Sequence, residues 1–155
     1  MKFVADVMLG KLARWLRLLG HDVLYSNTFE DGEIVRLADA EERIILTRDT
    51  GLVERRLARN RVCLIESTHW EAQLRQVAQS FALDLQIHPW ARCTVCNGQL
   101  SPVPKEALAD RVPPATFQSQ DHFLQCQECR RIYWRGTHWE RMQQTLHRVA
   151  QVTSP

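Results

Sequence analysis

The sequence lacks several features that would assign it to a large functional class. No apolar run approaches the roughly 20 residues that a membrane-spanning helix needs, so we expect no membrane partner. It has no G-x-G-x-x-G, G-x-x-x-x-G-K-[ST] or G-x-S-x-G motif, so neither a Gly-rich phosphate loop nor a serine-hydrolase elbow is supported. The formal net charge is only +2. Any contact with nucleic acid must therefore rest on local basic patches.

The beginning of the sequence also lacks a targeting signal. It reads M-K-F-V-A-D, with neither an apolar h-region nor a small-residue cleavage site. We therefore expect a cytoplasmic protein whose thiols stay reduced. A disulfide framework is consequently the weaker interpretation of its five cysteines.

Four of those cysteines form two C-x-x-C pairs, Cys93 with Cys96 and Cys126 with Cys129. A C-x-x-C turn directs both sulfurs to one ion, at about 2.3 Å from Zn²⁺, and two such turns complete a closed tetrahedral site. A redox C-x-x-C would stand alone, whereas this motif is duplicated. We therefore predict one structural zinc ion in a small zinc ribbon with four cysteine ligands.

Strand-like and helix-like patterns alternate over the first ninety residues. Apolar runs typical of strands lie at 2–5, 22–25, 43–47 and 62–65. Helices are predicted near 9–20, 34–42, 50–59 and 68–82, the last opened by a capping box at Thr68. This alternation indicates an α/β fold with a mostly parallel sheet. We expect three segments: an α/β domain at 1–88, the zinc ribbon with a C-terminal helix at 89–145, and a flexible tail at 146–155.

Three aspartates are the candidates for chemistry. Asp6 and Asp49 follow predicted strands and Asp31 precedes the second helix, so all three can face the crevice at the carboxyl ends of the strands. Converging carboxylates repel one another unless a divalent cation lies between them, and oxygen ligands suit Mg²⁺ or Mn²⁺. Each acid also has a simpler explanation as a helix cap or turn residue. Glu33 and Glu54 are alternatives for a fourth carboxylate.

Several segments together resemble one family. They are F-V-A-D at 3–6, M-L-G-K-L-A-R-W-L-R-L-L-G at 8–20, D-G-E-I at 31–34, I-L-T-R-D at 45–49, Y-W-R-G-T-H at 133–138 and the two cysteine pairs. Through these residues the chain resembles the PIN-like Mut7-C RNase family over roughly residues 2–145. The resemblance implies a PIN-like three-layer domain followed by a zinc ribbon. It also implies a metal-dependent RNase whose catalytic acids are Asp6, Asp31 and Asp49, the residues that would hold Mg²⁺ or Mn²⁺.

Basic and aromatic residues then acquire a role in seating RNA, since arginines bind phosphates and aromatic rings stack on unpaired bases. The candidates are Lys11, Arg14, Arg48, Arg55, Arg56, Arg59, Arg131 and Trp134. Lys11, Arg14 and Arg17 share one face of the first helix, which is either a solvated basic ridge or a phosphate-binding one. We expect RNA with single-stranded regions as the partner. A monomer and a homodimer are both open.

The leading hypothesis is therefore a cytoplasmic ribonuclease that depends on Mg²⁺ or Mn²⁺ and also carries one structural zinc ion. One alternative is a non-catalytic RNA- or ribosome-binding protein with the same fold. Another is a protein-interaction adaptor that uses the ribbon, with the acids serving only as caps.

Overall fold

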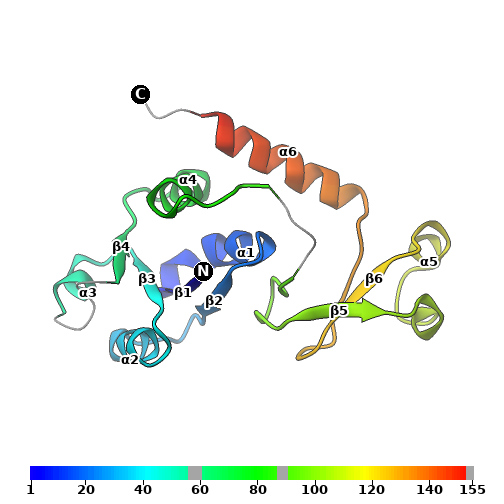
Figure 1. Cartoon of the computed structure of the whole chain (residues 1–155), viewed down its shortest axis with the longest axis horizontal. Helices are drawn as coiled ribbons and strands as arrows, with labels where there is room; N and C mark the ends of the chain where they lie inside the picture. The colour runs from blue at the N-terminus through cyan, green and yellow to red at the C-terminus, as the bar shows by residue number, and fades with distance from the viewer. Residues whose placement is uncertain (56–60, 87–90, 153–155) are drawn as a thin grey trace.

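The computed structural model describes residues 1–55, 61–86 and 91–152 of the chain. These residues form a four-stranded parallel sheet flanked by helices and a separate three-stranded antiparallel sheet. The last helix starts beside the antiparallel sheet and runs back over the helices of the parallel one (Figure 1). The predicted α/β fold with a parallel sheet is confirmed.

The parallel sheet has the strand order β2-β1-β3-β4. Its strands are β1 (Lys2–Ala5), β2 (Asp22–Tyr25), β3 (Ile44–Thr47) and β4 (Val62–Leu64). Phe3 pairs with Val23 on one side and with Ile44 on the other. The carboxyl ends of β1 and β3 therefore lie next to each other, and this edge of the sheet is where ligands bind in folds of this kind.

Helices cover both faces of this sheet. They are the short η1 (Val7–Leu9), α1 (Gly10–Leu18), α2 (Asp31–Glu41), α3 (Thr50–Glu54) and α4 (Trp70–Phe81). Side chains alternate along β1, so Phe3 and Ala5 join the core under α1 and α4, while Val4 joins the core under α2 and α3. The result is a helix, sheet, helix arrangement of three layers.

Helix α1 follows from its leucine pattern. Leu9, Leu12, Leu16 and Leu19 recur at helical spacing, and all four are buried in the core. Gly20 ends the helix in the left-handed region, with φ of +92°. Its N–H donates to the Arg17 carbonyl, and the next N–H reaches back to Leu16, as expected for a glycine just past a helix end.

The antiparallel sheet has the order β5-β6-β7. The elements of this part are β5 (Leu100–Val103), η2 (Lys105–Leu108), α5 (Pro114–Ser119), β6 (Phe123–Cys126), β7 (Ile132–Tyr133) and the last helix α6 (Thr137–Gln151). We call residues 91–136 the ribbon. Trp139 of α6 packs near the ribbon against Leu18, whereas Leu146 and Val149 are buried in the core that α1 and α4 cover.

Some element boundaries differ from the sequence-based expectation. Helix α4 begins at Trp70, and within the described residues no side chain caps it, so the expected capping box at Thr68 does not form. Helix α6 extends to Gln151 and includes residues 146–151, which were expected in the flexible tail. The reason is packing, because Leu146 and Val149 are buried against the first core. Helix α3 ends at Glu54, and the expected extension to residue 59 and the boundary at 88 lie outside the described residues.

Candidate functional site

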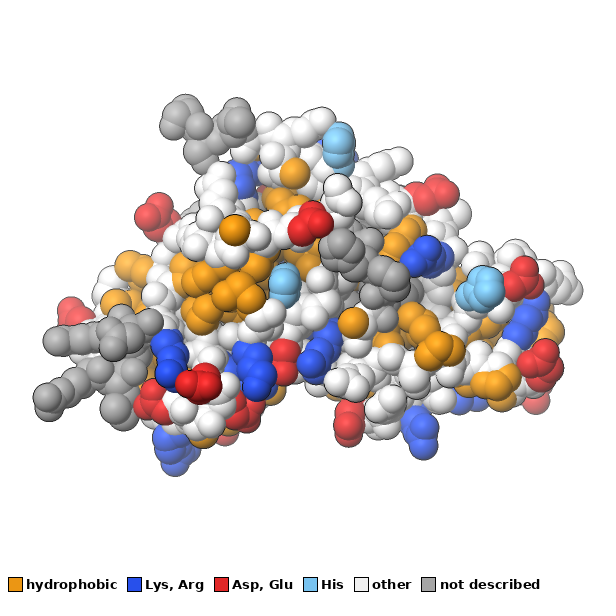
Figure 2. Space-filling model, in the orientation of Figure 1, with side chains coloured by type: hydrophobic (Ala, Val, Ile, Leu, Met, Phe, Trp, Pro, Cys, Tyr) orange, Lys and Arg blue, Asp and Glu red, His pale blue; other side chains and the backbone are white. Residues whose placement is uncertain are grey.

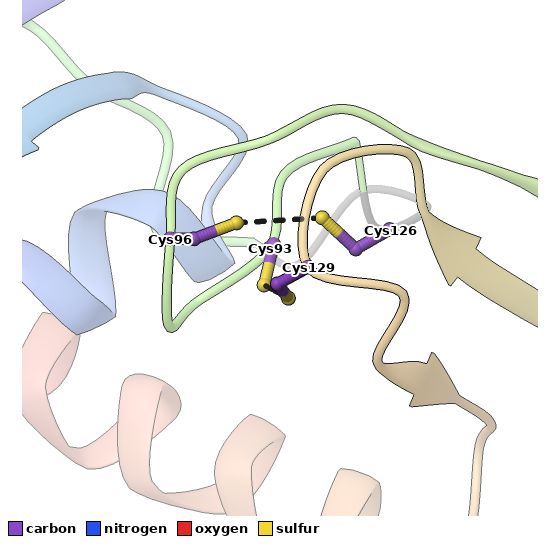
Figure 3. Close-up of side chains that lie close together, drawn as sticks. All are labelled: Cys93, Cys96, Cys126 and Cys129. Carbon is purple, nitrogen blue, oxygen red and sulfur yellow. Dashed lines mark hydrogen bonds between the residues drawn. The ribbon is translucent and has the colours of Figure 1, made fainter.

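The four paired cysteines meet at one point between α1 and the antiparallel sheet, as predicted (Figure 3). Their sulfur atoms all lie within 4.8 Å of one another. Cys93 Sγ is 3.7 Å from Cys129 Sγ, and Cys96 Sγ is 3.4 Å from Cys126 Sγ. A tetrahedral site with Zn–S bonds of about 2.3 Å separates its sulfurs by about 3.8 Å. The cluster can therefore hold one zinc ion.

The protonation of the cluster also favours a cation. Burial opposes ionisation of Cys93, but hydrogen bonds from the Tyr133 hydroxyl and from nearby backbone N–H groups lower its pKa to about 7. Burial and the neighbouring sulfurs raise the pKa of Cys96 to about 12. A second thiolate beside the first is thus disfavoured. A divalent cation removes this conflict, because it binds the thiolates and offsets their charge.

Local backbone geometry closes each cysteine pair around the site. The residue after each pair is left-handed, Asn97 with φ of 72° and Arg130 with φ of 65°. Asparagine adopts this region more readily than most residues. Gly98 allows close approach of the two turns, because a Cβ there would lie 2.7 Å from Cys126 Sγ.

Arg17 supports the first cysteine pair and is not part of a solvated ridge. Its guanidinium is buried, donates to the Val23 carbonyl at 2.8 and 2.9 Å, and also reaches the Thr94 and Val95 carbonyls at 3.3 and 3.0 Å. The expected basic face of α1 therefore consists of Lys11 and Arg14 alone, and Arg17 joins the parallel sheet to the ribbon.

A second contact between sheet and ribbon centres on Asp22, which sequence reasoning missed. Its Oδ1 accepts from Arg43 Nη1 at 2.7 Å and from Asn97 Nδ2 at 2.8 Å, and its Oδ2 lies 3.5 Å from Arg92 Nη2. Asn97 Oδ1 in turn accepts from the Val23 N–H at 3.0 Å. The sequence signal for this contact is Asn97, the polar residue directly after Cys96.

At the carboxyl edge of the parallel sheet, a buried hydroxyl links two of the predicted acids. Thr47 Oγ1 donates to Asp6 Oδ2 at 2.7 Å and accepts from the Asp49 N–H at 2.9 Å. Asp6 is only 7% exposed, and its Oδ1 also accepts from the Val7 N–H. Asp49 is exposed, and its Oδ1 accepts from Gly51 N–H. The edge thus presents one buried and one exposed carboxylate on adjoining strands.

The third acid, Asp31, begins α2 and lies 3.9 Å from Arg55 Nη2 through its Oδ2. Glu33 also lies in the first turn of α2, and Glu54 ends α3. Among the described residues, the four cysteines are the group of three or more possible ligands that lie within 4.8 Å of one another. Asp6, Asp31 and Asp49 therefore do not meet this spacing.

Four of the predicted RNA-binding residues line two adjoining hollows beside α1. The larger hollow, about 550 Å³, is lined by Lys11 and Arg14, and the smaller, about 240 Å³, by Arg14, Arg131 and Trp134. Thr94 lines both hollows, and sequence reasoning missed it. The structure therefore brings together two residues of α1 and two of the ribbon that are far apart in the sequence.

The other basic candidates lie elsewhere or outside the described residues. Arg48 directly follows β3, and its buried Nε has no hydrogen-bond partner among the described residues. Arg55 is the partner of Asp31. Arg56 and Arg59 lie outside the described residues. Over α2, basic and acidic side chains intermix, so this face has no single-sign field (Figure 2).

Comparison with known proteins identifies one family. The family model described as the Mut7-C RNase domain matches residues 1–146, which is nearly the whole chain. No curated protein and no solved structure matches the chain. Within residues 1–55, 61–86 and 91–152, the structure contains no helix whose length and apolar character suffice to cross a membrane.

Proposed function

This chain belongs to the Mut7-C RNase domain family, and on that premise we propose that it is a ribonuclease that depends on Mg²⁺ or Mn²⁺. Asp6, Asp31 and Asp49 are its proposed catalytic acids, and zinc in the cysteine cluster has a structural role. We further propose that it works in the cytoplasm, as a monomer or homodimer, on RNA with single-stranded regions.

The observation that carries this proposal is the pair of carboxylates at the carboxyl edge of the parallel sheet. Asp6 is almost fully buried yet carries no paired cation among its described contacts, and its orientation is fixed by Thr47 and by the Val7 N–H. A helix-capping role would need only the contact with the Val7 N–H. It would not explain why the carboxylate is buried, because burying a charged group costs free energy unless the charge is compensated. Asp49 lies on the adjoining strand end, and Thr47 connects the two residues.

The donor set fits a hard divalent cation in its chemistry, since all three groups are carboxylates. Asp6 and Asp49 would hold the ion from the strand ends, and Asp31 would complete the set from the start of α2. When bound, such an ion activates water and offsets charge on a phosphate. The three acids do not all lie within 4.8 Å of one another, so at least one of them must move closer or bind the ion through water.

The chain's own residues supply the remaining functions. Thr47 holds the Asp6 carboxylate in one orientation, and the Gly51 N–H does the same for Asp49. Arg55 lies beside Asp31 and can exchange that carboxylate for a phosphate oxygen. Lys11 and Arg14 are exposed on α1, which begins just after Asp6 and η1, and they can hold the RNA backbone near the acids.

The test is cleavage of a labelled RNA by the parent protein and by Asp6→Asn, Asp49→Asn and Asp31→Asn. We expect activity that is lost with a chelator and restored by Mn²⁺. We expect no cleavage by the Asp6 and Asp49 variants and full cleavage by Asp39→Asn, which replaces an exposed acid of α2. If Asp31 is only a helix residue, its variant will cleave normally, since asparagine is tolerated at helix starts.

The rival function, a non-catalytic RNA-binding protein, is favoured by one observation, the spacing of the three acids. It predicts RNA binding that is equal in the parent and in Asp6→Asn, with no cleavage by either protein at any Mn²⁺ concentration. That outcome would replace the enzyme proposal.

A further inference from the structure

The smaller of the two hollows beside α1 shares lining residues with a third hollow on the ribbon. This third hollow, about 580 Å³, lies against β5, β6 and the segment after α5, and it is lined in part by Tyr133, Trp134 and Arg135. Tyr133 and Trp134 also line the small hollow, which in turn shares Arg14 and Thr94 with the large one. We call these three adjoining hollows the track. Its lining comes from α1, from the first cysteine turn and from the strands of the ribbon.

The charge along the track has one dominant sign. Its cations are Lys11, Arg14, Arg131 and Arg135, and all four side chains are exposed. Asp121 is the acid among its described lining residues, and its Oδ1 lies 3.5 Å from Lys105 Nζ. A row of exposed cations along a surface depression is complementary to a phosphodiester backbone.

An aromatic side chain stands at the junction of the small hollow and the ribbon hollow. The Trp134 ring contacts two others, with centroids 6.2 Å from Phe123 and 6.2 Å from His138, the latter ring nearly perpendicular. Such packing limits the motion of the indole, so little freedom is lost when a further ring stacks on it. Unpaired bases stack on platforms of this kind, whereas the bases of a duplex stack on one another.

We propose that the track binds single-stranded RNA, with phosphates along Lys11, Arg14, Arg131 and Arg135 and a base against Trp134. This inference rests on the proposed ribonuclease function and specifies how its substrate approaches. The strand would enter over the ribbon and reach α1, which begins shortly after Asp6 and η1. Single strands are selected because the base must be accessible to the indole.

The zinc cluster and the track share a residue. The Tyr133 hydroxyl lies 2.9 Å from Cys93 Sγ and 3.5 Å from Thr94 Oγ1, while the same tyrosine lines the two hollows on the ribbon side. Thr94 belongs to the first cysteine turn and lines the track as well. The proposal therefore requires an intact cysteine cluster for RNA binding, in addition to the basic residues.

The test is binding of labelled RNA in buffer without Mg²⁺ or Mn²⁺, with single strands of about four to sixteen nucleotides and a duplex of the same sequence. We expect tighter binding of longer single strands and weaker binding of the duplex. Arg14→Gln and Arg131→Gln should each weaken binding and lower the salt slope by about one unit. Arg36→Gln, at an exposed position of α2 on the other side of the sheet, should change neither.

The stacking contact has its own variants. Trp134→Ala should weaken binding by about 5- to 150-fold, the range for loss of one stacked base, and Trp134→Phe should restore much of it. Because the alanine variant can also perturb the ribbon, a photoreactive uridine in the single strand provides a second measurement on the parent protein. Crosslinks should fall on residues 131–135.

Equal effects of the α1, ribbon and α2 arginine variants, or crosslinks confined to other segments, would overturn the proposal. A preference for duplex RNA would do the same. These results are distinct from those that would contradict the ribonuclease proposal. That proposal fails if RNA is not cleaved, or if cleavage does not depend on Asp6, even when RNA still binds along the track.

Discussion

At the scale of single residues, the most informative group is the hydroxyl of Thr47. It is completely buried and connects the Asp6 carboxylate to the backbone of Asp49. A β-branched residue suits a strand for reasons of packing alone. The two hydrogen bonds give this threonine a further role, because they set the relative positions of two candidate acids on neighbouring strand ends.

Replacing this hydroxyl should affect both stability and the proposed activity. Thr47→Val keeps the shape but leaves Asp6 Oδ2 without its donor and the Asp49 N–H without its acceptor, so we expect a loss of about 1–3 kcal/mol in the free energy of unfolding. RNA cleavage should fall with it. Thr47→Ser should keep most of both. Urea denaturation and a cleavage assay measure these effects, and a valine variant as active and stable as the parent would contradict this role.

Two glycines provide a matched test of packing. A Cβ on Gly10 would lie 2.7 Å from the Tyr25 hydroxyl, so Gly10→Ala should lower the free energy of unfolding by about 1–3 kcal/mol through overpacking. At Gly32, in α2, no described atom lies within 4 Å of the added Cβ. Gly32→Ala should therefore raise stability by up to about 1 kcal/mol. Urea midpoints that shift in the same direction for both variants would refute this account.

At the scale of elements, the ribbon is held to the parallel sheet by side chains from both parts. Arg17 of α1 binds the carbonyls of the first cysteine turn, and Asn97 of that turn binds Asp22 and the backbone of β2. These contacts depend on the turn keeping its shape. The state of the cysteine cluster should therefore influence the sheet as well as the ribbon.

Zinc removal tests this coupling. We expect about one zinc ion per chain in reduced protein, and Cys126→Ser should lose it, because structural zinc supplies a large part of the folding free energy of small metal sites. Amide exchange should then rise across residues 91–136 and also near Val23, whose N–H and carbonyl contact Asn97 and Arg17. Cys63→Ser is the matched control, since Cys63 lies outside the cluster.

Elemental analysis measures the zinc content, and hydrogen exchange followed by mass spectrometry measures the amide exchange. Parent protein without zinc would contradict the metal site. An exchange increase restricted to the ribbon would show that the cluster and the sheet are independent.

The Asp22 contact also predicts a pH dependence. Burial raises the pKa of Asp22. Hydrogen bonds from Arg43 and Asn97, together with the charges of Arg43 and Arg92, lower the pKa by more than burial raises it, so the net shift is downward. A lowered pKa in the folded state adds stability above the unfolded-state value near 4, and this stability is lost as pH falls through the folded-state pKa. Asp22→Asn should therefore reduce stability at neutral pH and flatten its decline below about pH 4. Parallel stability curves for parent and variant would contradict this.

At the scale of the whole molecule, the elements with a strong physical pattern could be predicted. The leucine spacing of α1 and the apolar run of β3 determine which faces are buried, and the repeated C-x-x-C spacing indicates a shared metal site. Each of these signals is a short pattern of a few residues, and the two cysteine pairs are matched by their identical spacing although they lie apart in the sequence. They give the α/β order of elements and the cysteine cluster.

What could not be predicted depends on contacts between distant segments. Arg17 has the spacing of an exposed residue, but its acceptors Thr94 and Val95 lie 77 and 78 positions away, and no periodicity indicates them. Likewise, strand ends place Asp6 and Asp49 at one edge, whereas the position of Asp31 depends on the path of the loop before α2. The basic and aromatic residues of the ribbon were predicted to bind RNA, but not that Arg131 and Trp134 lie beside Arg14 of α1.

The course of α6 has a consequence for how the chain can be divided. Leu146 and Val149 complete the core beneath α1 and α4, and Arg75 Nε of α4 donates to the Val149 carbonyl. The ribbon is therefore an insertion in the sequence between segments that share one hydrophobic core, rather than a module appended after that core. A chain cut before the ribbon would lack the side chains of α6 that complete this core. A shortened version should instead keep α6 and join residue 86 to residue 137 through a flexible linker, so that Leu146 and Val149 stay in the core.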